Sequence, residues 1–237
     1  QHGTNAVGSA TILQNFEVKK DGGYSKILGY IKYDSAAVTG TGKVLALKAI
    51  SSTKIIAARE DGSETKYYKS SGSGWSLLTN GDSLNSLGGK VNHADFNLTG
   101  DDKVIFVDGV NAPQVYNTSN DSLTAISSSS VAAASHVMYK NTAFYSVNNL
   151  LKFAAPYSVD DLSVTNGAGE INITQPITGL VVFRDQLIIF TKNSVKKLTG
   201  SSAADFTVSP IADNIGCLNG DTIQEIGGDI IYLAADG

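Results

Sequence analysis

The residue types that carry most enzymatic chemistry are few and scattered in this chain. It has one cysteine, Cys217, and three histidines, His2, His93 and His136. A cysteine nucleophile needs a histidine base within hydrogen-bond reach, and none of the three histidines is near Cys217 in the sequence. We therefore expect Cys217 to be a small buried side chain. A thiol–histidine pair brought together by the fold stays open as the alternative.

Two pairs of adjacent acids, Asp101–Asp102 and Asp160–Asp161, are the other chemically interesting residues. Both fall where we predict turns, and neither belongs to a twelve-residue calcium loop. We expect them to cap turns, with a calcium site as the alternative. Gly167-Ala168-Gly169 begins like a dinucleotide-binding loop, but Asn172 stands where the third glycine belongs.

Other catalytic and metal-binding motifs are missing from the sequence. It contains no Gly-x-Ser-x-Gly elbow and no cluster of cysteines and histidines with zinc-ligand spacing. The sequence therefore predicts no catalytic residue, no cofactor-binding residue and no metal ligand. We expect a protein that is not an enzyme and that uses no cofactor.

The composition narrows the class of protein further. The 237 residues are 42% hydrophobic and only 17% charged, with a net charge of −4. An acidic chain without a basic stripe argues against specific nucleic-acid binding. No run of 18 apolar residues occurs, so we expect no membrane span. The length suits one all-β domain.

Similar apolar segments recur along the chain and reveal its organisation. They begin about 39 to 49 residues apart, at Lys54, Lys103, Thr142, Gln186 and Asp229. Strand-rich repeats of this length are typical of the blades of β-propellers. The second strand of each repeat is the most continuously apolar, as expected of a strand buried on both faces. The sequence predicts an all-β fold, a β-propeller of about five four-stranded blades.

The repeats divide the chain, which we treat as a single domain over 1–237. The predicted parts are N-terminal closing strands (1–40), four blades (41–80, 90–127, 131–166 and 177–212) and a partial blade (221–237). The predicted blade strands are 44–51, 54–60, 65–70 and 75–79; 91–97, 103–107, 113–117 and 122–126; 135–139, 142–147, 149–154 and 161–165; and 178–183, 186–192, 194–199 and 206–211. An extra strand is predicted within 167–176.

The two ends of the chain each supply two further strands. At the N-terminus they fall at 11–18 and 24–33, and at the C-terminus at 222–226 and 229–233. We predict that the two pairs form one composite blade that closes the ring and removes its open edges. The alternative is that the chain is part of a larger propeller.

The aromatic residues and long loops are the remaining candidates for binding. Trp75 starts a strand, and we expect it to pack between blades, with a ligand-stacking role as the alternative. Long loops on rigid β scaffolds tend to carry contacts. We therefore expect loops 80–89 and 155–176 to engage partners.

Several short segments of the sequence resemble segments of virion structural proteins of tailed bacteriophages. They are Ala10–Phe16, Gly22–Tyr30, Tyr68–Trp75, Pro176–Leu180, Phe183–Phe190, Ser194–Gly200 and Asp213–Cys217. The resemblance spans most of the chain, and no single motif in it is diagnostic. Family members usually continue past the turn that corresponds to Asp236–Gly237. We therefore expect either a compact version closed by its own N-terminus or a portion of a longer protein.

The resemblance implies a function as well as a fold. It implies a β-propeller component of a phage tail, such as a nozzle or a head–tail connector or stabilisation protein, located in the virion. Such a protein acts as a rigid assembly module in a multi-subunit ring, here expected to be a homo-oligomer. Its partners are other virion proteins, namely tail, adaptor or portal components. The alternative is a carbohydrate- or receptor-binding propeller.

Overall fold

A series of four-stranded antiparallel sheets makes up most of the computed structural model of this protein. The structure describes residues 14–29, 31–78, 88–97, 100, 102–126 and 131–234. The helices of this part are two single 3₁₀ turns, η1 (Val164–Asn166) and η2 (Gly220–Thr222). The predicted all-β class is confirmed.

Four contiguous stretches of chain each form one complete sheet. Their strands are β3 (Val44–Ser51), β4 (Lys54–Asp61), β5 (Glu64–Ser70) and β6 (Trp75–Leu77) in sheet 1; β7 (Asn92–Phe96), β8 (Lys103–Val107), β9 (Gln114–Asn117) and β10 (Ser122–Ala125) in sheet 2; β11 (Ser135–Tyr139), β12 (Thr142–Val147), β13 (Leu150–Phe153) and β14 (Gly169–Asn172) in sheet 3; and β15 (Ile177–Phe183), β16 (Gln186–Thr191), β17 (Ser194–Thr199) and β18 (Thr207–Asp213) in sheet 4. Within each sheet, neighbouring strands follow one another in the sequence. Fifteen of these sixteen strands overlap the predicted ones.

The exception is the fourth strand of sheet 3. Residues 161–165 form no strand, and the predicted extra strand is in fact β14, which pairs with β13 from Leu150↔Asn172 to Phe153↔Gly169. The apolar Leu162 belongs to a loop and packs against the core between sheets 2 and 3. The Asp161 carboxylate accepts hydrogen bonds from the backbone N–H of Ser163 and from Asn166, which bends this segment instead of extending it.

The core lies between successive sheets. Second strands turn alternate side chains to the two neighbours: Val104 and Phe106 of β8 face sheet 1, whereas Ile105 faces sheet 3. In β16, Leu187 and Ile189 pack against sheet 3. Ile188 and Phe190 pack against the C-terminal segment. All four apolar residues from 187 to 190 are at most 5% exposed. This confirms that the second strands are buried on both faces.

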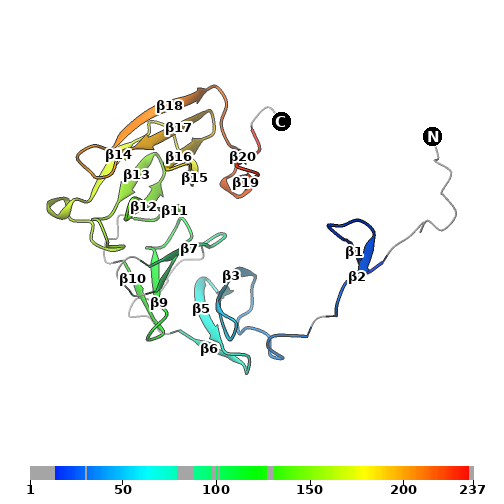
Figure 1. Cartoon of the computed structure of the whole chain (residues 1–237). Helices are drawn as coiled ribbons and strands as arrows, with labels where there is room; N and C mark the ends of the chain where they lie inside the picture. Colours follow the sequence, from blue (N-terminus) through cyan, green and yellow to red (C-terminus); the bar gives the residue numbers. More distant parts are fainter. Residues whose placement is uncertain are drawn as a thin grey trace, which may run out of the picture.

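Each end of the described chain forms a separate two-stranded hairpin. The N-terminal hairpin consists of β1 (Phe16–Val18) and β2 (Tyr24–Lys26), and the C-terminal hairpin of β19 (Gln224–Ile226) and β20 (Asp229–Ile231). Among the described residues each hairpin pairs only with itself, so the predicted composite blade does not form within one chain here. Figure 1 shows the sheets following one another along an arc, with the N-terminal hairpin standing apart from it.

The segment that follows the N-terminal hairpin is held on sheet 1. Asp34 accepts hydrogen bonds from Ser70 Oγ at 2.5 Å and from Gly74 N at 2.8 Å. Trp75 Nε1 donates to the Ala36 carbonyl at 3.1 Å. Trp75 thus fixes this segment on sheet 1, whereas a position between blades was predicted.

Candidate functional site

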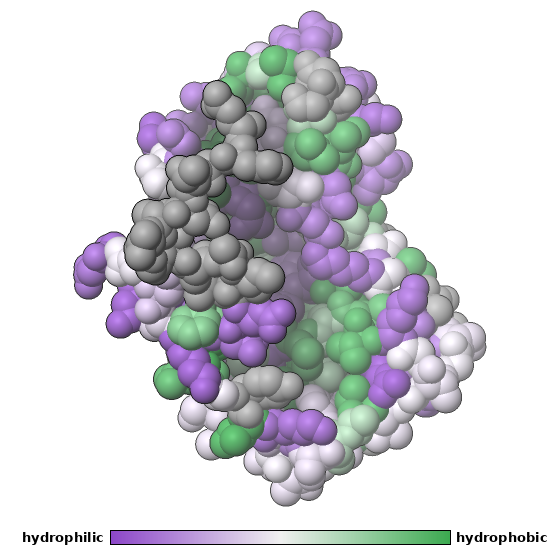
Figure 2. All heavy atoms as spheres, turned by 90° about the vertical axis from the view of Figure 1, so that its right-hand side faces the viewer, coloured by the Kyte–Doolittle hydropathy of each residue, from purple (hydrophilic) through white to green (hydrophobic). Residues whose placement is uncertain are grey.

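The first strands of the sheets come together around a hollow. β3 contacts β7, β7 contacts β11, β11 contacts β15, and β15 contacts η2. Residues of β7, β11, β15 and η2, with the segments just before them, line a hollow of about 400 Å³. Figure 2 looks into the open side of the arc and shows hydrophilic residues in the recess between the upper and lower parts of the molecule. We take this hollow as the candidate site because polar side chains from several sheets converge on it.

Two histidines from neighbouring first strands line the hollow, His93 on β7 and His136 on β11. Neither ring nitrogen of His136 finds a hydrogen-bond partner among the described residues. Burial lowers the pKa of His136 to about 4, and the nearby His93 adds to this shift. Burial and the charge of Lys48 also lower the pKa of His93. Both imidazoles are therefore neutral at pH 7, and each then offers one donor and one acceptor.

Charged groups at the hollow are largely engaged by one another or by the backbone. Lys90 Nζ lies 2.5 Å from Asp221 Oδ1. Asp108 accepts hydrogen bonds from the backbone N–H of Val110 at 2.9 Å and of Asn111 at 2.7 Å. The hollow therefore presents neutral polar groups beside compensated charges, an arrangement suited to a neutral polar ligand or to ordered water.

Close backbone contact between β15 and η2 shapes one wall of the hollow. A Cβ atom on Gly179 would lie 2.4 Å from Ile223 Cδ1, and one on Gly220 would lie 2.4 Å from the Thr178 carbonyl oxygen. Only glycine allows the two segments to approach so closely. Thr178 Oγ1 is buried at this contact with no hydrogen-bond partner in the described part of the chain.

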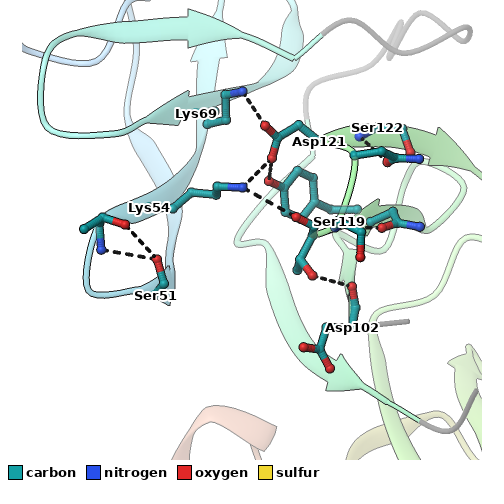
Figure 3. Close-up of polar contacts among 12 residues, drawn as sticks. Ser51, Lys54, Lys69, Asp102, Ser119, Asp121 and Ser122 are labelled. Carbon is teal, nitrogen blue, oxygen red and sulfur yellow. Dashed lines mark hydrogen bonds and ion pairs between the residues drawn. The ribbon is translucent and has the colours of Figure 1, made fainter. Parts of the chain in front are cut away.

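A separate polar cluster joins sheets 1 and 2 at their outer parts. The Asp121 carboxylate accepts hydrogen bonds from Lys54 Nζ at 2.6 Å and Lys69 Nζ at 2.7 Å, both on sheet 1. It also accepts one from the Tyr116 hydroxyl at 2.5 Å (Figure 3). Burial alone would raise the pKa of Asp121, but the hydrogen bonds from both lysines and the tyrosine lower it well below its usual range. The three donors engage both carboxylate oxygens, and two of them come from the other sheet, so we interpret the cluster as a link between sheets.

The sequence-predicted chemical residues take structural roles where the structure describes them. Cys217 is buried, and its Sγ lies 3.1 Å from the Asn219 carbonyl oxygen, so the predicted small buried side chain is confirmed. Asp161 caps a turn as predicted. Asp101 and most of the predicted loop 80–89 lie outside the described residues. Among the residues described, no three or more His, Cys, Asp or Glu side chains gather to hold a metal ion.

Exposed large apolar side chains gather at the two ends of the described chain. Of eighteen such residues, nine lie between 14 and 78 and five between 215 and 234, whereas the long middle stretch holds four. The end residues are Phe16, Tyr24, Ile27, Leu28, Ile31, Tyr33, Val44, Leu47 and Leu77 on one side and Ile215, Leu218, Ile226, Ile231 and Leu233 on the other. Concentrated exposed apolar residues mark interaction surfaces.

Sequence reasoning missed the hollow and the Asp121 cluster. The two histidines are 43 positions apart, and only the contact between β7 and β11 brings them to one site. A usable signal was present, because His93 and His136 occupy the second position of the first strand in consecutive repeats. Asp121, Lys54 and Lys69 carry no comparable signal, since they occupy different positions in their repeats.

Comparisons with known proteins support the fold class alone. No protein-family model and no curated protein matches the sequence. No helix in the described part of the chain is long and apolar enough to cross a membrane. Among solved structures, the chain is similar to the extracellular domain of a putative one-component system of B. thetaiotaomicron, with 11% identity and a TM-score of 0.50. The match covers 76% of this chain and 24% of that chain, so it spans only about a quarter of that chain's length.

Proposed function

We propose that this chain is a non-catalytic structural component of a bacteriophage virion, in the tail or the head–tail connector. In this proposal its sheets are the blades of a β-propeller, and it acts as a rigid assembly module in a multi-subunit ring. The virion assignment is supported by the sequence resemblance described above. The assembly role is supported by one structural observation, which is the concentration of exposed apolar side chains at both ends of the described chain.

The contrast between the middle and the ends of the described chain supports an assembly role physically. The interior sheets bury their apolar faces against one another, so these faces are already removed from water. The end surfaces lack such a neighbour in the described chain, and apolar surface in water favours association. A stiff scaffold whose two ends expose apolar side chains is suited to holding neighbouring subunits at fixed positions.

The assembly proposal is tested by expressing the tagged chain in a culture that produces the corresponding virion proteins. We expect it to co-purify with tail, adaptor or portal components and to appear as a symmetric ring by electron microscopy. A matched variant with Ile226 and Leu233 changed to serine should lose this association while keeping its β-sheet circular dichroism. A chain that binds no virion component overturns the proposal.

The hollow supports a second candidate function, the binding of a carbohydrate or receptor. Asn92, Asn219 and the two neutral histidines offer the mixture of donors and acceptors that a sugar hydroxyl requires. A glycan array with the isolated chain tests this function. Binding that is lost in Asn219→Ala, while no virion protein is captured, would favour this candidate over the structural one.

A further inference from the structure

A polar pocket of about 460 Å³ lies at one end of sheet 4. Three segments line it, namely the link between β14 and β15, the turn between β16 and β17 with the start of β17, and the end of β18 with the residue after it. We call it the sheet 4 pocket. It shares no lining residue with the hollow. All of its lining side chains are polar or charged, which sets it apart from the mostly apolar pockets that bind typical small molecules.

The corresponding end of sheet 3 differs from this pocket in two side chains. In sheet 3, Asn149 ends the turn between the second and third strands, and Asn172 lies opposite the start of β13. Asn149 Nδ2 donates a hydrogen bond to Asn172 Oδ1 at 3.1 Å. In sheet 4 the same two positions hold Asn193 and Asp213. Neither of these exposed side chains has a hydrogen-bond or ion-pair partner in the described part of the chain. Sheet 4 therefore presents to its pocket an amide and a carboxylate whose counterparts in sheet 3 engage each other.

Gln175 and Lys196 add hydrogen-bond donors to the sheet 4 pocket. Gln175 Oε1 accepts a hydrogen bond from Thr191 Oγ1 at 2.8 Å, and the NH2 group of Gln175 has no partner among the described residues. Lys196 Nζ donates to the Ile173 carbonyl at 2.8 Å and lies 3.5 Å from Thr174 Oγ1. One of the three N–H groups of this ammonium therefore remains for a ligand. The pocket combines several donors with one strong acceptor, the carboxylate.

Thr174 lines the sheet 4 pocket with an unfavourable backbone conformation. Its φ is +73°, which β-branched residues rarely adopt. The conformation is held because Asn172 Oδ1 accepts a hydrogen bond from the Thr174 N–H at 2.7 Å and Lys196 binds the preceding carbonyl. Backbone strain of this kind gathers at functional sites. Here it accompanies a threonine hydroxyl at the pocket, where glycine would adopt the same backbone without strain.

The charges of the pocket favour a neutral ligand. The Lys196 ammonium disfavours a cation, and the Asp213 carboxylate disfavours an anion. A neutral group that both donates and accepts hydrogen bonds satisfies both side chains. Neighbouring hydroxyl groups of a sugar do this, because their O–H groups donate to the carboxylate while their oxygens accept from amide and ammonium N–H groups.

We propose that the sheet 4 pocket binds a neutral saccharide. Asp213 accepts hydrogen bonds from two sugar hydroxyl groups, and Asn193, Gln175 and Lys196 donate to sugar oxygens. This inference goes beyond the assembly function and does not require it, and the site is separate from the hollow. No aromatic ring lines the pocket for a sugar face to stack on, so a single site binds weakly and several copies of the chain bind a multivalent glycan more tightly.

Binding of the full chain to an array of immobilised neutral and acidic glycans tests this inference. We expect binding to neutral glycans, with competition by a neutral methyl glycoside. Free glycine, a zwitterion that also lacks net charge, should not compete. Binding of glycine in place of sugars, or no binding to any neutral glycan, overturns the proposal.

Asp213→Asn is the decisive variant, because it gives sheet 4 the pair of amides that sheet 3 contains. It should lower the affinity for the neutral glycan by about tenfold or more while leaving the urea midpoint of unfolding no lower. Glu225→Gln is the matched control, since it removes an exposed carboxylate on β19 that has no partner in the described chain. It should bind as the unchanged chain does. An unchanged affinity in Asp213→Asn, or an equal loss in Glu225→Gln, overturns the site.

Thr174→Gly separates the effect on the fold from the effect on the site. Glycine removes the backbone strain, so the urea midpoint should stay the same or rise. The lost hydroxyl should weaken glycan binding by about 2- to 10-fold. Glycan binding that is lost in Asn219→Ala but kept in Asp213→Asn places the ligand in the hollow. That result overturns this inference and supports the second candidate function instead.

Discussion

Sheets 1 and 2 are joined in a different way from sheets 3 and 4. Both interfaces contain buried apolar side chains, but the first adds the Asp121 cluster with its two lysines. Aromatic rings contribute to both interfaces. The first has the pair Tyr67–Phe106 at 5.2 Å, whereas the second has a cluster of three, Phe144, Phe153 and Phe206, with ring centroids 5.3 to 5.5 Å apart. The aromatic interface is stabilised by the apolar area that it removes from water. The Asp121 cluster instead fixes how the two sheets are positioned and makes their contact sensitive to pH.

The largest expected effect of a single substitution lies in the aromatic interface. Phe144 is fully buried, so Phe144→Ala leaves a cavity that sheets 3 and 4 cannot close. We expect a loss of about 3–5 kcal/mol in the free energy of unfolding, measured by urea denaturation. Val164→Ala, at an exposed position of η1, should change it by less than about 0.5 kcal/mol. A small loss at Phe144 would show that the two sheets are not packed as described.

The interface between sheets 2 and 3 offers a pH-dependent case. The folded-state pKa of His136 is about 4, against about 6.5 in the unfolded chain, so the unfolded state binds more protons between these values. Stability should therefore be complete above about pH 6.5 and fall as the pH drops toward 4, by no more than about 3 kcal/mol. His136→Gln should flatten this part of the profile of unfolding free energy against pH. An unchanged slope would show that His136 is solvated.

The polar link should respond to a smaller extent and at lower pH. Asp121→Asn should cost about 1–2 kcal/mol, because two lysines lose their partner but remain partly in contact with water. The folded-state pKa of Asp121 is lowered, so its contribution is present above the unfolded value of about 3.9 and is lost as the pH falls below it. Acid titration of both proteins checks this. The variant should lack the corresponding loss, and Asp95→Asn should retain it.

The smallest effect is expected at an exposed ion pair between sheets 3 and 4. Lys140 and Asp185, in equivalent turns of sheets 3 and 4, lie 2.6 Å apart, but Asp185 is 78% exposed. Lys140→Met should reduce the unfolding free energy by about 0–1 kcal/mol, and added salt should reduce the difference. A loss as large as that of Asp121→Asn would show that exposed and partly buried links contribute alike.

The fold was predictable because burial repeats at a regular interval. The apolar second strands, such as Lys103–Val107 and Gln186–Thr191, mark the buried strand of each sheet. The fourth strand of sheet 3 was predicted wrongly over 161–165. Leu162 and Val164 alternate with polar residues as in a strand, but Leu162 packs into the core from a loop and Val164 is exposed. Local pattern does not distinguish a loop residue inserted into a core from a strand residue.

The site was less predictable because it depends on contacts between repeats. Cys217 was correctly expected to be buried, since the sequence offers no histidine beside it. The hollow requires the approach of three first strands and the absence of side chains at Gly179 and Gly220. The attachment of the segment after the N-terminal hairpin to sheet 1 involves Asp34, a single acid whose partners Ser70 and Gly74 are far away in the sequence.

Each of the four complete sheets is made from one uninterrupted stretch of chain, and this has a consequence for biogenesis. Most backbone pairing within a sheet joins residues that leave the ribosome close together, which shortens the loops that must close before contacts form. Sheets 1 to 4 can therefore form one after another during synthesis, each on the face of the one before.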